Sequence, residues 1–150
     1  MIKRHGDSPE VGRAYEMRAG AYGILERGDQ ILLAWQSEPY NDLLLPGGGI
    51  DPGESPVQAL HREVYEETGW RIAKPVRLGA FRRFTYMPEY DKWAEKVCHI
   101  YVARPTICLG PPLEPDHTAV WMHKAEAAPL LCNSGDAEFL AKRLFAREKI

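Results

Sequence analysis

Long apolar runs are missing from this sequence of 150 residues. No stretch approaches the roughly 20 consecutive apolar residues that a membrane-spanning helix needs. The segment from Met1 to Glu10 is polar and does not resemble a signal peptide. We therefore expect a cytoplasmic protein with no membrane partner.

Cysteine is scarce, and neither sign of charge is in clear excess. Cys98, Cys108 and Cys132 are odd in number and lack CxxC spacing, which argues against a disulfide framework and against a structural zinc site. The 19 basic and 21 acidic residues give a formal net charge of −2. Such a chain has no general basic field for long nucleic acid or anionic membrane, so a small molecule is the expected partner.

Apolar residues make up 45% of the chain, enough for the core of one domain over residues 1–150. The segment from Met17 to Trp35 alternates as two strands divided by the turn pair Gly28-Asp29, which predicts a hairpin. The glycines and prolines from Pro46 to Gly53 predict a loop without regular structure up to Ser55.

A helix is expected to begin at Ser55 and to end at Gly69. Ser55, Pro56 and Gln58 combine an N-cap residue, a proline in the first turn and the far member of a capping box. Further patterns predict strands over residues 71–86, 96–104 and 119–122 and a terminal amphipathic helix over 136–148 that carries Leu140 and Phe145. This order of elements predicts an α/β fold, a mixed sheet between helices on both faces.

Three carboxylates on the central helix are the most informative feature. Glu63, Glu66 and Glu67 follow i, i+3, i+4 spacing and therefore lie on one side. We expect no lysine or arginine one turn away on that side, so a divalent cation would neutralise the cluster. Mg²⁺ prefers oxygen ligands and leaves positions open for water and substrate phosphates, which favours phosphate chemistry.

The alternative for two adjacent glutamates is an ordinary solvated helix face. The wider spacing argues against it: Gly48, five residues, Glu54, seven residues, Arg62-Glu63, then Glu66-Glu67, Gly69 and Trp70. This segment resembles the Nudix box at every specified position, with the bulky Trp70 in the final apolar slot as a mild departure. Average residue usage gives a chance match on the order of 10⁻⁸.

The resemblance to the Nudix family implies the Nudix-type α/β/α sandwich and a set of roles for the box residues. Glu63 and Glu67 would bind Mg²⁺ or Mn²⁺ directly, with Glu66 and the carbonyl of Gly48 as further ligands. Glu54 and Arg62 match the family's supporting salt bridge, which would orient Glu63.

The activity that the resemblance implies is hydrolysis of a diphosphate linkage in a nucleotide. Metal ions would screen the phosphate oxygens and activate the attacking water. Glu66 and Glu114 are the first candidates for the general base, ahead of Glu63, Asp116 and His117. Glu114 is also a candidate fourth metal ligand, or simply a solvated loop residue.

The resemblance implies that substrate selection depends on residues outside the box. Arg18, Arg82 and Arg83 are candidates for phosphate contacts, and Tyr86 for stacking on a base. Tyr86 lies sixteen residues after Trp70, which tilts the family rule toward dinucleoside polyphosphates, while nucleoside triphosphates remain open.

The sequence is compatible with two other functions. A Nudix-fold module could bind a nucleotide without hydrolysis, although the intact box favours an enzyme. An RNA-end processing enzyme would need a positive groove, against which the mild net acidity speaks. The run Leu43–Leu45 and the aromatic strands are candidates for a homodimer face.

Overall fold

A mixed β-sheet forms the centre of the molecule in the computed structural model, which describes residues 2–148, with side chains up to residue 145. The strands are β1 Lys3–Arg4, β2 Glu16–Arg27, β3 Gln30–Gln36, β4 Asp42–Leu44, β5 Gly47–Gly49, β6 Trp70–Met87, β7 Lys92–Cys108 and β8 His117–His123. The helices are α1 Pro56–Thr68, α2 Lys124–Ala127, the 3₁₀ helix η1 Ala128–Leu130 and α3 Ser134–Glu148.

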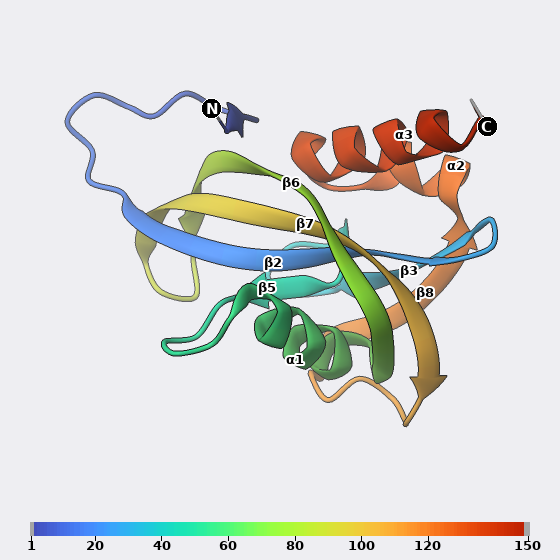
Figure 1. Cartoon of the computed structure of the whole chain (residues 1–150). Coiled ribbons are helices and arrows are strands. Elements are labelled where there is room, and N and C mark those ends of the chain that lie inside the picture. The colour runs from blue at the N-terminus through green and yellow to red at the C-terminus, as the bar shows by residue number, and fades with distance from the viewer. Residues whose placement is uncertain (1, 149–150) are drawn as a thin grey trace.

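The strands run in the order β1-β6-β7-β2-β3-β4, and β5 and β8 pair with β2 and β3. β2 is parallel to β7, and β1 is parallel to β6, whereas the other pairs are antiparallel. Figure 1 shows α1 on one side of the sheet and α3 on the other. The predicted mixed sheet between helices is therefore confirmed.

Each face of the sheet has its own apolar core. On the α1 side, Leu60 and Val64 pack with Leu25 of β2. On the α3 side, Leu140 packs with Phe81 of β6 and Ile24 of β2. Alternate residues of a strand point to opposite faces, so β2 contributes to both cores.

Most of the predicted elements are present. β2 and β3 form the expected hairpin, with Leu25 opposite Leu32. β6, β7 and β8 cover the three later strand predictions and extend beyond them. The terminal helix is present as well, but Phe145 is 64% exposed, so its expected place in the apolar stripe is wrong.

Two expectations between β3 and α1 are corrected. Residues 47–49 are not irregular, because Gly47, Gly48 and Gly49 pair with Tyr22, Ala21 and Gly20 as the short strand β5. Leu43 and Leu45, expected as part of a homodimer face, are buried in the α3-side core of the same chain, so these two residues are not available for such a face.

The ends of α1 match the sequence prediction closely. The Ser55 hydroxyl accepts a hydrogen bond from the amide of Gln58 at 3.1 Å, and the Gln58 side chain accepts one from the amide of Ser55 at 2.8 Å. Gly69 ends the helix in the left-handed conformation, at φ 79°. These two caps fix the register of α1 and hence the direction of its carboxylates.

Among the described residues, no helix is both long and apolar enough to cross a membrane.

Candidate active site

Strand β5 brings the glycine segment against the carboxylates of α1. The amide of Gly47 donates a hydrogen bond to Glu67 Oε1 at 2.9 Å. A Cβ atom added at Gly48 would stand 2.5 Å from Cδ of Glu63, far inside contact distance. The main chain at Gly48 can approach Glu63 so closely only because no side chain is present there.

Arg62 connects the loop before α1 to the helix. Its guanidinium holds Glu54 through two bonds, of 2.7 and 3.0 Å, and donates to the carbonyl of Gly49 at 2.9 Å. This fork lowers the pKa of Glu54 to about 2. The Glu54–Arg62 salt bridge expected from the box is therefore present.

The expectation that no cation lies beside the carboxylates is wrong. Arg62 Nη1 lies 2.9 Å from Glu63 Oε1 and 3.3 Å from Glu66 Oε2, the latter an i, i+4 pair. Residues four apart on a helix are neighbours, so the spacing of Arg62 and Glu66 already predicted this contact. One guanidinium thus contacts both the supporting glutamate and two of the candidate ligands.

Glu67 is buried, and its carboxylate is held from two sides. Besides the Gly47 amide, Nε2 of His117 lies 3.2 Å from Glu67 Oε2, and both side chains are almost fully covered. Burial raises the pKa of Glu67, against the opposing effects of His117 and the Gly47 amide. In turn, Glu67 raises the pKa of His117.

Glu63 is destabilised as an anion by its surroundings. Burial, followed by the negative charge of Glu67, raises the pKa of Glu63 to about 7, even though Arg62 lowers it. Two partly or fully buried carboxylates that repel each other favour a bound cation, because a divalent ion would compensate both charges.

The loop that carries Glu114 is attached to the last turn of α1. The carbonyl of Glu66 accepts hydrogen bonds from the amides of Leu113 and Glu114, at 2.8 and 3.2 Å. The charge of Glu114 also raises the pKa of Glu67, which places the two carboxylates within electrostatic reach. The structure therefore brings Glu114 to the carboxylate helix.

No three acidic, histidine or cysteine side chains form a ready-made cation site within residues 2–148. Glu63 is instead paired with Arg62, and Glu67 with Gly47 and His117. The donor set still fits a hard divalent cation, because it offers carboxylate oxygens around a glycine cradle that a Cβ would fill.

A cavity of about 1220 Å³, here called the large cavity, adjoins these carboxylates. Gly48, Glu63 and Glu67 line it, and so do three of the proposed substrate residues, Arg18, Arg83 and Tyr86. Tyr86 is partly exposed and donates a short hydrogen bond to Asp91.

Arg82 does not line the large cavity; it lies 4.0 Å from Glu95 and over the ring of Phe84. Arg82 and Arg83 are neighbours in β6, and neighbours in a strand point to opposite faces. The alternation of the strand therefore favours only one of the two arginines for the large cavity, and the structure places Arg83 there.

Three polar residues of the large cavity were missed by sequence reasoning: Lys96, Asn133 and Asp136. Burial lowers the pKa of Lys96, and burial raises the pKa of Asp136 to about 6. Asn133 and Asp136 cap the start of α3 by exchanging bonds of 2.8 and 2.9 Å. Only Lys96 could have been identified from the sequence. It alternates with Cys98 and Ile100 along one strand, so its side chain was expected on the apolar face of that strand.

A family model described as "NUDIX domain" matches residues 14–142 of the chain. Among curated proteins, the chain is 40% identical over 67 residues to a putative 8-oxo-dGTP diphosphatase of Bacillus subtilis, which covers 44% of each chain. It is 41% identical over 83 residues to an RNA pyrophosphohydrolase of Pectobacterium atrosepticum, which covers 55% of this chain and 41% of that protein. The chain thus spans less than half the length of these two relatives.

The fold has close counterparts among solved structures. A NUDIX hydrolase from Nitrosomonas europaea superimposes with a TM-score of 0.70, covering 87% of this chain and 90% of that one at 20% identity. At this level of identity the likeness concerns the fold.

Proposed function

The chain belongs to the NUDIX family, and on that premise we propose that it is a metal-dependent hydrolase that cleaves a diphosphate linkage in a nucleoside diphosphate derivative. The observation that carries the proposal is the pair of half-buried Glu63 and buried Glu67 beside the glycine strand β5, next to a cavity with cationic side chains. Nucleoside triphosphates and dinucleoside polyphosphates are the favoured substrates.

Glu63, Glu67 and the carbonyl of Gly48, with Glu66 beside them, would hold Mg²⁺ or Mn²⁺. Such an ion would screen the phosphate oxygens and lower the pKa of the attacking water. Arg62 fixes Glu63 relative to the loop through its bonds to Glu54 and Gly49. His117 and the Gly47 amide keep the Glu67 carboxylate in one orientation.

The proton of the attacking water needs an acceptor, and we favour Glu114 over Glu66. The Glu66 carboxylate already accepts from Arg62 at 3.3 Å. The Glu114 carboxylate makes no hydrogen bond or ion pair with the described residues, while its backbone is fixed on α1. A fixed backbone with an uncommitted carboxylate suits a general base.

The large cavity is the proposed binding site of the substrate. Arg18, Arg83 and Lys96 offer positive charge for phosphates, on the approach to the carboxylates. Asn133 and Asp136, at the start of α3 on the other side of the sheet, offer polar atoms for a base (Figure 1). Cationic side chains for phosphates, together with polar atoms for a base, favour a nucleotide over inorganic diphosphate as the substrate.

The test is a product screen with nucleoside triphosphates, dinucleoside polyphosphates, ADP-ribose and nucleotide sugars, each with Mg²⁺ or Mn²⁺. We expect the substitutions Glu63→Gln and Glu67→Gln to abolish turnover without unfolding the chain. Glu126→Gln, an exposed glutamate of α2, is the matched control and should leave turnover unchanged. Full activity in both Glu63→Gln and Glu67→Gln would contradict the proposal.

A Nudix-fold module without catalytic activity is the alternative. Such a module would show thermal stabilisation by a nucleotide and no product with either cation.

A further inference from the structure

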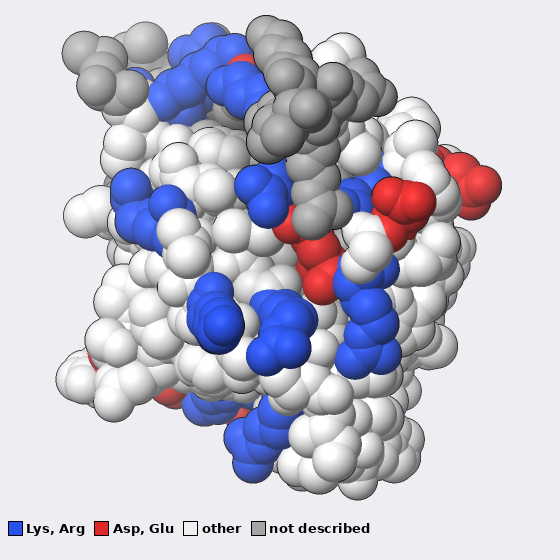
Figure 2. Space-filling view, turned by 45° about the vertical axis from the view of Figure 1, so that its right-hand side comes forward, with Lys and Arg blue, Asp and Glu red and all other residues white. Residues whose placement is uncertain are grey.

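A second cavity, here called the basic cavity, lies apart from the proposed active site. Its volume is about 680 Å³, and it shares no lining residue with the large cavity. β2, β6, β7 and α3 contribute to it, close to the β2–β3 turn. Figure 2 turns this side of the molecule toward the viewer, and basic side chains predominate on it.

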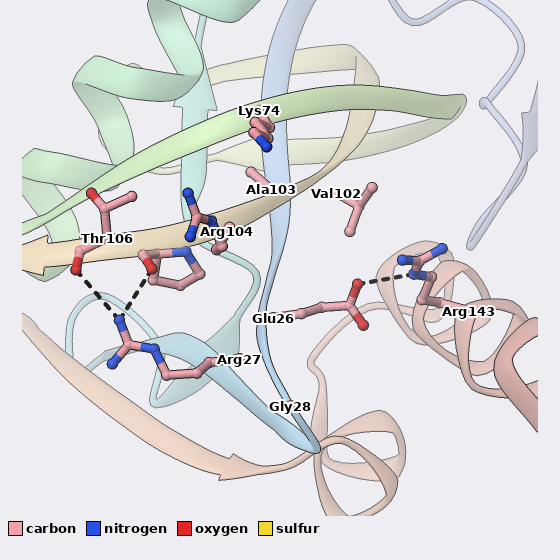
Figure 3. Close-up of a pocket in the computed structure, with 10 residues that line it drawn as sticks. Glu26, Arg27, Gly28, Lys74, Val102, Ala103, Arg104, Thr106 and Arg143 are labelled. Atoms are coloured by element: carbon pink, nitrogen blue, oxygen red, sulfur yellow. Dashed lines mark hydrogen bonds and ion pairs between the residues drawn. The ribbon is translucent and has the colours of Figure 1, made fainter.

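Four cationic residues line the basic cavity: Arg27, Lys74, Arg104 and Arg143. The single carboxylate there is Glu26, which is buried and already contacts two cations, Lys124 at 2.5 Å and Arg143 at 2.9 Å. Figure 3 shows Glu26 turned toward Arg143 and away from Arg27 and Arg104. The carboxylate therefore leaves a clear excess of positive charge, in a chain whose net charge is −2.

Two of these cations have no partner among the described residues. The side chains of Lys74 and Arg104 make no hydrogen bond or ion pair there, although they line the same concave surface. Like charges that share a cavity without a counter-ion repel each other, so an anion would stabilise this arrangement.

The backbone turns Lys74 into this position at a cost. Lys74 has a positive φ of 53°, a conformation that disfavours residues with a side chain, and it precedes Pro75. It lies in the irregular stretch of β6 between Ala73 and Val76, where the register with β7 shifts. Bulges of this kind redirect a side chain, and Lys74 follows Ala73, which lies opposite Arg104 of β7.

Arg27 is held in place and keeps donors for a ligand. Its Nη2 donates to the carbonyls of Pro105 and Thr106 at 3.1 and 3.5 Å, as Figure 3 shows. Its guanidinium also lies over the ring of Trp70, 4.9 Å from the ring centre. Its other guanidinium N–H groups make no hydrogen bond with a described residue.

We propose that the basic cavity binds a small oligophosphate anion through Arg27, Lys74 and Arg104. Arginine donates to phosphate oxygens in pairs, and lysine adds a point charge. The space of about 680 Å³ exceeds that of a single phosphate, and all three cations line this one concave surface, which favours a short phosphate chain. The ligand is either a free oligophosphate or the phosphate chain of a nucleotide.

The test measures tripolyphosphate binding by calorimetry, in a chelator that removes divalent cations. We expect saturable binding to the unmodified chain and at least about tenfold weaker binding to the double variant Lys74→Ala/Arg104→Ala, which loses two charge-assisted contacts. The matched control Arg4→Ala/Arg71→Ala removes the same charge from exposed positions that line neither cavity and should change the affinity less than about twofold. The variant Arg18→Ala/Arg83→Ala removes two cations from the large cavity and measures any tripolyphosphate binding there. Lys74 and Arg104 are exposed, so the thermal midpoint should be unchanged and should confirm a folded variant.

Two further ligands identify the source of the anion. Equal affinity for tripolyphosphate and a nucleoside triphosphate assigns the site to the phosphate chain alone, whereas tighter nucleotide binding that is lost in Lys74→Ala/Arg104→Ala assigns it to a nucleotide. A short 5′-hydroxyl RNA that binds more tightly than either would overturn the proposal. So would weakening only in Arg18→Ala/Arg83→Ala, or no saturable binding. None of these results depends on hydrolysis, so they stand apart from the test of the proposed function.

Discussion

The imidazole Nε2 of His117 lies 3.2 Å from Oε2 of Glu67, in a part of the site where both side chains are almost completely buried. The two residues come from β8 and α1, fifty positions apart in the sequence. The contact holds the Glu67 carboxylate on the side opposite the Gly47 amide. Support of this kind tunes a ligand without contacting the substrate.

Loss of this support should weaken the proposed metal site. We expect His117→Ala to lower turnover or apparent metal affinity by about 10–100-fold, the usual range for residues that orient metal ligands. His117→Gln, which keeps a side-chain donor, should recover part of the loss. The measurement is a Mn²⁺ titration of activity, with His61→Ala as the control. An unchanged His117→Ala variant would show that Glu67 needs no such support.

The three glycines of β5 should respond differently to alanine. At Gly47 a Cβ would meet the Ala21 carbonyl oxygen at 2.2 Å, and φ is 153°, so Gly47→Ala should destabilise the fold by more than about 2 kcal/mol. At Gly48 the Cβ would meet only the end of the Glu63 side chain, which can move. Gly48→Ala should therefore keep the fold and lose activity.

Gly49→Ala is the control in this series, because a Cβ there meets nothing within 4 Å. Urea unfolding and turnover, measured on all three variants, separate the two effects. Equal loss of stability in Gly47→Ala and Gly48→Ala would refute the assigned roles.

Arg62 should not be replaceable by lysine. An ammonium group cannot reproduce the fork that binds Glu54 at 2.7 and 3.0 Å while also reaching Gly49 and Glu63. We expect Arg62→Lys to lower the free energy of unfolding by about 1–3 kcal/mol and to lower turnover. Chemical denaturation is the measurement, and Arg4→Lys on β1 should be neutral. A stable and fully active Arg62→Lys chain would contradict this view of the fork.

Asp136 should make stability depend on pH. Burial raises its pKa from 3.8 to about 6 in the folded chain. A raised folded-state pKa favours folding below the unfolded pKa, and this contribution is lost as pH rises from about 4 to about 6. The difference of about two pKa units corresponds to at most about 3 kcal/mol.

Asp136→Asn removes this titration. We therefore expect the free energy of unfolding, measured in urea, to fall less between pH 4 and pH 7 in the Asp136→Asn variant than in the unmodified chain. A parallel pH dependence in both chains would mean that Asp136 titrates normally.

The sequence predicted local features better than tertiary ones. The caps of α1 and the spacing from Glu54 to Glu67 are determined by neighbouring residues, so motif and helix geometry were sufficient. The strand Gly47–Gly49 was missed because glycines carry no side-chain alternation; its pairing depends on backbone contact with β2. Asn133 and Asp136 were missed because only the packing of α3 on the sheet brings them to the large cavity.

The attachment of the Glu114 loop to α1 runs through main-chain atoms only, from two amides to the carbonyl of Glu66. Side-chain exchange at position 66 therefore leaves that anchor intact, and exchange at position 114 leaves the loop where it is. The scaffold can present different acids or bases at one fixed point, so chemistry there can diversify among related chains without rebuilding the surrounding architecture.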